Sequence, residues 1–240
     1  MTTYTVPNLY LDMIDRPHLL IAGATGSGKS VAINGLIYAA MAHYGAGCGF
    51  ILIDPKRVEL AAYRTTRQCI RYASEPADMI QALKDTVTII DNRYKALAAR
   101  RMRRQTAGPI YVVIDELADL MTTAKREVQP LLQRICQIGR AANVHVIAAT
   151  QCPLAKIIPT EIKVNFDYRL GLRMAQPQHS RNLLDMTCCE TLPPFGQGFY
   201  QTPLETKKYI VPMIPEKDLT RICRDFRKGF FALLRTACAC

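Results

Sequence analysis

The sequence of 240 residues lacks the patterns of a zinc-binding, secreted or membrane-spanning chain. It has nine cysteines but no C-x-x-C pair, and its four histidines do not fall at zinc-ligand spacing from them. No basic segment followed by an apolar one opens the chain, and no apolar run approaches the ~20 residues that a spanning helix needs. We therefore expect a cytoplasmic protein with reduced thiols, which partner proteins would have to recruit to a membrane.

Acidic residues are scarce relative to basic ones. The chain has 31 Lys and Arg against 20 Asp and Glu, which gives a formal net charge of +11 and a pI near 9.3. This excess favours a polyanionic partner, either nucleic acid or an anionic membrane surface, although a basic protein without such a partner has the same composition. The length and a hydrophobic content of 49% suffice for one substantial core.

Short apolar runs alternate with segments of helical periodicity along the chain, and no internal repeat or low-complexity linker interrupts them. From Pro76 to Leu97, for example, apolar residues recur at helical spacing and mark one face of a long helix. This alternation predicts an α/β fold with a mostly parallel central sheet flanked by helices. The predicted strands are 18–22, 50–53, 110–114, 144–149 and 168–172, with further helices at about 31–40 and 128–138, an edge strand at 207–211 and a closing helix at 230–234.

A phosphate-binding loop is predicted at residues 23–30, which read Gly-Ala-Thr-Gly-Ser-Gly-Lys-Ser and match G-x-x-x-x-G-K-[ST] between a strand and a helix. Glycines let the backbone curl so that successive N–H groups face the phosphates of ATP, and the helix that begins near Lys29 adds its positive dipole end. The Lys29 ammonium would reach the β- and γ-phosphates, and the Ser30 hydroxyl would bind Mg²⁺. The predicted nucleotide-binding residues are Gly23, Ala24, Thr25, Gly26, Ser27, Gly28, Lys29, Ser30 and Val31.

Two acidic residues, Asp115 and Glu116, follow the apolar strand at 110–114. Asp115 is expected to hold the Mg²⁺ shell and Glu116 to polarise the attacking water. Two ordinary acids at a strand end would give the same pattern, but the phosphate-binding loop favours the functional interpretation. Because a regulatory nucleotide site needs no water activator, Glu116 indicates hydrolysis of ATP rather than binding alone.

Polar side chains also follow two other predicted strands. Asp54 comes after the strand at 50–53, and Gln151 comes after the strand at 144–149. Gln151 either contacts the γ-phosphate, positions the water or is an ordinary polar strand end. Because ligands bind at the carboxyl ends of parallel strands, we expect both residues to converge with the phosphate-binding loop, Asp115 and Glu116 at one edge of the sheet.

Several further motifs follow one another along the chain. They are Pro-His-Leu-Leu-Ile-Ala-Gly at 17–23, Ile-Asp-Pro-Lys at 53–56 with Glu-Leu at 59–60, Asp-Asn-Arg-Tyr-Lys at 91–95, Val-Ile-Asp-Glu-Leu-Ala-Asp-Leu at 113–120, Gly-Arg-Ala-Ala-Asn-Val-His at 139–145, and Ala-Ala-Thr-Gln-Cys-Pro at 148–153. Together, and in this order, they resemble the motor domain of the FtsK/SpoIIIE family over about residues 15–200.

The resemblance implies a RecA-like P-loop ATPase domain at 17–212, between an N-terminal lead-in at 1–16 and a C-terminal helical tail at 213–240. It implies a ring, usually a hexamer of identical chains, that uses ATP and Mg²⁺ to move double-stranded DNA with weak sequence preference. It also implies that Arg140 is an arginine finger, which reaches the nucleotide of a neighbouring subunit.

Chemistry alone does not choose this arginine, because Arg57, Arg169 and Arg181 are further candidates and Arg140 also fits a solvated cation at a helix end. A second basic group precedes the strand at 110–114 and either contacts the DNA backbone or is a solvated helix end. This Arg cluster comprises Arg100, Arg101, Arg103 and Arg104, and the same two interpretations apply to Lys156, Lys163 and Arg173.

The chain departs from the family pattern at Cys152, where arginine is usual, and in the near absence of an insertion before the strand at 110–114. It also shows neither the membrane domain nor the winged-helix DNA reader of chromosome motors, which favours a motor that works with membrane-bound or mobile-element partner proteins. Two alternatives are a coupling or secretion ATPase of a conjugation or type VII-like system, and a nucleotide-gated assembly module without turnover.

Overall fold

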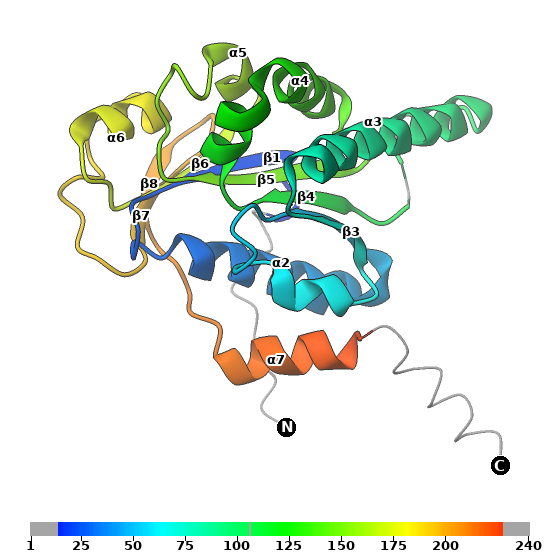
Figure 1. Cartoon of the computed structure of the whole chain (residues 1–240), viewed down its shortest axis with the longest axis horizontal. Coiled ribbons are helices and arrows are strands. Elements are labelled where there is room, and N and C mark those ends of the chain that lie inside the picture. The colour runs from blue at the N-terminus through cyan, green and yellow to red at the C-terminus, as the bar shows by residue number, and fades with distance from the viewer. Residues whose placement is uncertain (1–13, 106, 228–240) are drawn as a thin grey trace.

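An eight-stranded sheet runs through the centre of the computed structural model, which describes residues 14–105 and 107–227 (Figure 1). The strand order is β3-β2-β4-β5-β1-β6-β7-β8, with parallel pairing from β3 to β6 and antiparallel pairing of β7 with β6 and β8. The mostly parallel sheet and its edge strand are therefore confirmed. The strands are β1 His18–Ala22, β2 Gly49–Ile53, β3 Cys69–Ala73, β4 Ile110–Ile114, β5 Val144–Thr150, β6 Tyr168–Leu172, β7 Gln197–Gln201 and β8 Thr206–Ile210.

Helices cover both faces of the sheet. Figure 1 shows α2 and α7 on one side and α3, α4, α5 and α6 on the other. Strands β1, β2 and β4 are buried along their whole length, because side chains on both faces of the sheet meet a helical layer. The helices are α2 Lys29–Tyr44, α3 Pro76–Ala99, α4 Leu117–Ile138, α5 Thr160–Lys163, α6 Pro177–Leu184 and α7 Glu216–Asp225, with short 3₁₀ helices η1 Gly45–Gly47 and η2 Ala61–Thr65.

The helical periodicity of the sequence corresponds to the buried faces of these helices. In α3, Met79, Leu83 and Ile90 are buried in the core on the α3–α4 side, and Leu97 is buried near the end of the helix. Tyr94 belongs to the same periodic set but is 37% exposed, because it lies at the rim, where its hydroxyl donates a hydrogen bond to the Ile138 carbonyl. Burial of the apolar stripe, rather than helix propensity, is the main stabilisation of such a helix.

The side chain of His18 links two neighbouring strands of the sheet to a helix that covers it. The Val146 N–H donates to its Nδ1 at 3.1 Å, so its other nitrogen, Nε2, carries the proton and donates to the Cys136 carbonyl at 2.8 Å. The ring is 3% exposed and links β1, β5 and α4 in its neutral form. Burial lowers the pKa of His18 from 6.5 to about 4.

Some elements were not predicted from the sequence. Strand β3 has a mixed pattern in which Ile70 is exposed, and β7 contains a glycine and alternates buried residues with exposed or half-buried ones. The predicted closing helix at 230–234 lies outside the described residues, and the predicted domain boundaries stay a prediction. Across residues 14–105 and 107–227, no helix is both long and apolar enough to span a bilayer.

Candidate nucleotide-binding site

The loop between β1 and α2 has the backbone of an anion cradle. Gly26 and Gly28 adopt φ values of 74° and 101°, in the region that favours glycine. The helix α2 begins directly after Gly28, and no side chain caps its first turn. The N–H groups of this turn therefore remain available to phosphate oxygens, where the helix dipole also favours negative charge.

Distant segments hold this loop in place. The Gly23 N–H donates to the Thr150 carbonyl at the end of β5, and the Ala24 N–H donates to the Arg173 carbonyl after β6. The Gly196 N–H donates to the Ser27 carbonyl at 2.8 Å. Gly196 also lies so close to Gly28 that a Cβ added to Gly28 would be 2.9 Å from the Cα of Gly196. These backbone contacts hold the loop in its curled form.

The acidic pair faces the loop across the sheet edge. Glu116 is 3% exposed, and its Oε2 lies 3.7 Å from Lys29 Nζ and 3.6 Å from Lys56 Nζ. The Gln151 N–H donates to Glu116 Oε1 at 3.0 Å, and the Thr25 hydroxyl donates to the Gln151 side chain at 3.2 Å. The residues predicted to converge from the ends of β1, β4 and β5 therefore do so.

Burial sets the electrostatics of these groups. It raises the pKa of Asp115 to about 6, although the nearby Lys29 ammonium opposes that shift. It also lowers the pKa of Lys29, against the opposing effect of Glu116 and Asp115. A low-dielectric site with opposed charges strengthens the interaction of Lys29 with an anionic ligand.

Lys29 and Asp115 line one cavity of about 570 Å³. Its volume suits a small-molecule ligand such as a nucleotide. Three of its lining residues, Val58, Phe195 and Met213, are apolar and exposed. The other lining residues include Ala24, Thr25, Gly26, Gly28, Lys29, Ser30 and Val31 from the loop and α2, with Lys56, Glu59, Asp115 and Gln151.

The side chains of this cavity suit Mg²⁺ that arrives with a nucleotide. Ser30 and Asp115 supply oxygen atoms, the donor type that Mg²⁺ prefers. No group of three His, Cys, Asp or Glu residues that would hold a metal by itself occurs within the described part of the chain. Mg²⁺ usually keeps several waters and binds through one or two carboxylates plus substrate phosphates, so this sparse donor set fits it.

Arg140 lies far from this cavity in the topology of the sheet. It is exposed and lies in the turn between α4 and β5, at the end of the sheet where the parallel strands begin. The phosphate-binding loop follows the end of β1, which runs parallel to β5. The loop and Arg140 therefore lie at opposite ends of the parallel strands, and Arg140 cannot reach the site of its own chain.

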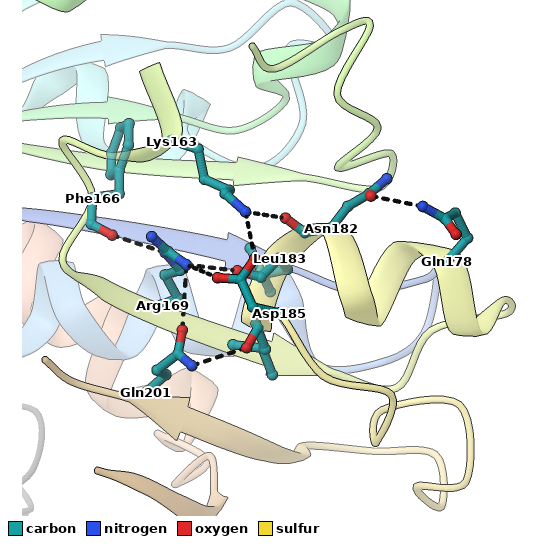
Figure 2. A network of polar contacts seen from close by, with 9 residues as sticks. Lys163, Phe166, Arg169, Gln178, Asn182, Leu183, Asp185 and Gln201 are labelled. Atoms are coloured by element: carbon teal, nitrogen blue, oxygen red, sulfur yellow. Dashed lines mark hydrogen bonds and ion pairs between the residues drawn. The ribbon is translucent and has the colours of Figure 1, made fainter. Parts of the chain in front are cut away.

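Of the other arginines proposed for that role, Arg169 is held within the fold. Figure 2 shows its guanidinium bonded to the carbonyls of Phe166 and Leu183 and to Asp185. Lys163 donates to Asp185 in the same network, so it is also partnered rather than free for DNA. Arg57 pairs with Glu75, and Arg181 is exposed on α6.

Several residues of the site were not predicted from the sequence as functional. Glu59 accepts a hydrogen bond from Ser30, and Phe195 and Met213 line the cavity from segments around β7 and β8. The Glu-Leu motif at 59–60 was a signal for Glu59. The Phe195 and Met213 segments carry no motif, and only the fold brings them to the loop.

Residues 5–111 and 98–155 match the sequence model of the FtsK/SpoIIIE family. The chain is 37% identical over 217 residues to the DNA translocase FtsK of Chlorobaculum tepidum, and 33% identical over 261 residues to that of Rickettsia typhi. The matches cover 82% and 89% of this chain but only 27% and 35% of those relatives, so the chain spans about a third of their length or less.

Two solved structures share the fold. The conjugation coupling protein TcpA of pCW3, solved with ATPγS, has a TM-score of 0.78 at 24% identity and covers 89% of this chain and 66% of its own. The cytoplasmic domain of the type VII secretion ATPase EccC of Thermomonospora curvata has a TM-score of 0.73 at 22% identity and covers 90% of this chain and 28% of its own. At these identities the likeness supports the P-loop ATPase fold.

Proposed function

The chain belongs to the FtsK/SpoIIIE family, and from this premise we propose that it is the ATP-hydrolysing motor of a ring that moves double-stranded DNA. The observation that carries the proposal is that Asp115 lines the same cavity as the phosphate-binding loop, while the neighbouring Glu116 places its Oε2 3.7 Å from Lys29 Nζ. The motor works in the cytoplasm, and recruitment to a membrane falls to partner proteins.

The chemistry within one subunit follows from these contacts. The Lys29 ammonium exchanges Glu116 for the β- and γ-phosphates of ATP. Mg²⁺, when bound, neutralises charge on the phosphate oxygens, and Ser30 and Asp115 are the side chains that hold it. Glu116 keeps the hydrogen bond from the Gln151 N–H, which orients its carboxylate to accept a proton from the attacking water. Gln151 thereby connects the water activator to the loop through Thr25.

The active site is completed by a neighbouring subunit. Arg140 is exposed at the sheet edge remote from its own cavity, which suits a cation that acts on the nucleotide of the next subunit in a homohexamer. An arginine in this role stabilises charge on the transferred phosphoryl group. A monomer should therefore hydrolyse ATP poorly, and assembly on DNA should accelerate it.

The Arg cluster supplies a surface for the DNA backbone. All four of its side chains are exposed, and within the described residues none of them forms an ion pair. The cluster lies at the same edge as Arg140, since the Gln105 N–H donates to the Ala141 carbonyl at 3.0 Å. Such unpaired cations bind DNA phosphates without contacting the base edges that distinguish sequences. This binding weakens as the salt concentration rises, because salt cations compete for the same phosphates.

A second candidate function is a coupling or secretion ATPase, and the fold likeness to TcpA and EccC favours it. Its cargo would be protein or a protein–DNA complex. A third, a nucleotide-gated assembly module, would form rings without hydrolysis.

The deciding experiment is the rate of ATP hydrolysis with and without linear duplex DNA across a salt series, with particle size recorded in parallel. DNA should stimulate the rate of hydrolysis at low salt, and Lys29→Ala should abolish hydrolysis. Lys84→Ala, on the exposed face of α3, is the control and should leave the rate unchanged. Full activity of Lys29→Ala would overturn the site. Stimulation of hydrolysis by a protein partner but not by DNA would select the coupling function. Rings that assemble with ATP but do not hydrolyse it, and that Glu116→Gln leaves unchanged, would select the assembly module.

A further inference from the structure

Three exposed apolar side chains border the cavity that holds the phosphate-binding loop. Phe195 is 81% exposed, Met213 is 74% exposed and Val58 is 72% exposed, yet all three line this one cavity. They come from separate loops, so no local sequence pattern accounts for their meeting. Single exposed apolar residues are normal on a protein surface, but a group of them at a concave site indicates an apolar ligand surface.

The backbone of Phe195 is fixed relative to the loop. Phe195 has a φ of 70°, a left-handed value that is uncommon for a residue with a side chain. Its neighbour Gly196 donates to the Ser27 carbonyl at 2.8 Å and accepts a hydrogen bond from the Val211 N–H at 2.8 Å. These two bonds tie the Phe195 position to the phosphate-binding loop on one side and to the end of β8 on the other.

The polar residues of the cavity are engaged at its phosphate end. Glu59 accepts from Ser30, Lys56 lies 3.6 Å from Glu116, and Thr25 donates to Gln151. Lys29 lies 3.7 Å from Glu116. The apolar residues are therefore the part of the cavity left for the non-phosphate portion of a nucleotide.

We propose that Phe195, together with Met213 and Val58, binds the base of the nucleotide, with the phenyl ring stacked against it. The inference rests on the proposed function, because it concerns the same cavity. The phenyl face offers the planar contact that a base prefers, and the unbranched Met213 side chain adapts to fill the remaining contact. None of the three side chains hydrogen-bonds the base edges, so ATP and GTP bind with similar affinity.

Binding measurements on the intact chain test this proposal without hydrolysis. Dissociation constants of ATPγS, GTPγS and inorganic tripolyphosphate are measured by competition against a fluorescent nucleotide, for the wild type, Phe195→Ala, Phe195→Tyr and Met213→Ala. Leu204→Ala is the matched control, because Leu204 is an apolar residue 95% exposed in the β7–β8 turn. Thermal melting and particle size of each variant are recorded alongside.

Phe195→Ala should weaken ATPγS and GTPγS alike by roughly 5- to 50-fold, the range expected for loss of one stacked base, and leave tripolyphosphate unchanged. Phe195→Tyr should bind as the wild type does, Met213→Ala should show a smaller loss of the same kind, and Leu204→Ala should show none.

Three results would overturn the inference: no loss in either alanine variant at the cavity, an equal loss for tripolyphosphate, or a loss that follows reduced particle size, which would assign these residues to contact between subunits. A wild type that binds none of the three ligands would instead refute the proposed function.

Discussion

The hydroxyl of Ser30 donates a 2.7 Å hydrogen bond to Oε1 of Glu59. A serine hydroxyl has one hydrogen and two lone pairs, so a hydrogen committed to Glu59 directs the lone pairs elsewhere, toward the cavity that both residues line. Glu59 is itself positioned by the fold, because the next residue, Leu60, donates its N–H to the buried carboxylate of Asp54 at 3.0 Å. Asp54 thus holds the loop that orients a predicted Mg²⁺ ligand.

Removal of Glu59 should therefore weaken the use of Mg²⁺ more than the binding of nucleotide alone. Groups that orient a metal ligand typically change metal affinity by about 10- to 100-fold when mutated. We expect Glu59→Ala to raise the Mg²⁺ concentration for half-maximal nucleotide binding by about 10-fold, measured by titrating Mg²⁺ against a fluorescent nucleotide. Glu75→Ala, which removes an exposed glutamate paired with Arg57, is the control. An unchanged Mg²⁺ midpoint in Glu59→Ala would show that the hydrogen bond does not serve the metal.

Gly28→Ala should destroy the cradle without a change of charge. Gly28 has a φ of 101°, and a Cβ there would lie 2.9 Å from the Cα and N of Gly196. Both the backbone conformation and the space exclude a methyl group, at a cost of about 1–3 kcal/mol for the backbone alone. We expect nucleotide affinity to fall at least about 10-fold, since the loop must open to relieve the contact. Gly47→Ala, where a Cβ meets nothing within 4 Å, should leave affinity unchanged, and equal losses in both variants would contradict the steric argument.

The sequence predicted the parts of this site that depend on local pattern. The apolar run of β1, the glycines at 26 and 28 and the acids after β4 each mark a strand end or a turn, and the parallel sheet brings them to one edge. The contacts that brace the site were not predictable in this way. Gly196 reaches Ser27 across more than a hundred residues of sequence, and only the completed β6–β7–β8 arrangement places it there.

Conversely, composition suggested roles that the fold does not support. Arg169 and Lys163 are cations in a basic chain, but both contribute to the network around Asp185. Their side chains are only 13% and 19% exposed, which a charge count does not reveal. Burial and pairing are properties of the tertiary structure, so a basic residue in the sequence remains ambiguous between fold and function.

Arg140 can be tested by mixing inactive subunits. Arg140→Ala and Lys29→Ala should each reduce ATP hydrolysis by about 10³-fold or more, the usual cost of losing an arginine finger or the loop lysine. If Arg140 acts on the neighbour, an equal mixture restores activity, because a subunit with intact Lys29 meets a neighbour with intact Arg140. Random assembly predicts recovery to about a quarter of the wild-type rate for a site shared between two subunits. A mixture as inactive as its components would refute a role for Arg140 at the neighbour's nucleotide. Arg134→Ala, on the adjoining helix α4, serves as a control.

The buried imidazole of His18 predicts how stability depends on pH. Its Nδ1 accepts a hydrogen bond from the Val146 N–H, so a proton on Nδ1 would place two N–H donors against each other inside the core. The folded-state pKa is lowered to about 4 from 6.5, so between these values the unfolded chain binds a proton that the folded chain does not. This contribution to the free energy of unfolding is fully present above pH 6.5 and is lost as pH falls, by about 2 kcal/mol at pH 5.

Urea unfolding at pH 7.5 and pH 5 measures the difference. His18→Gln should be less stable at pH 7.5 but lose less between the two values, with a residual loss from His145, whose pKa burial also lowers. An identical loss in both proteins would mean that His18 does not carry the effect.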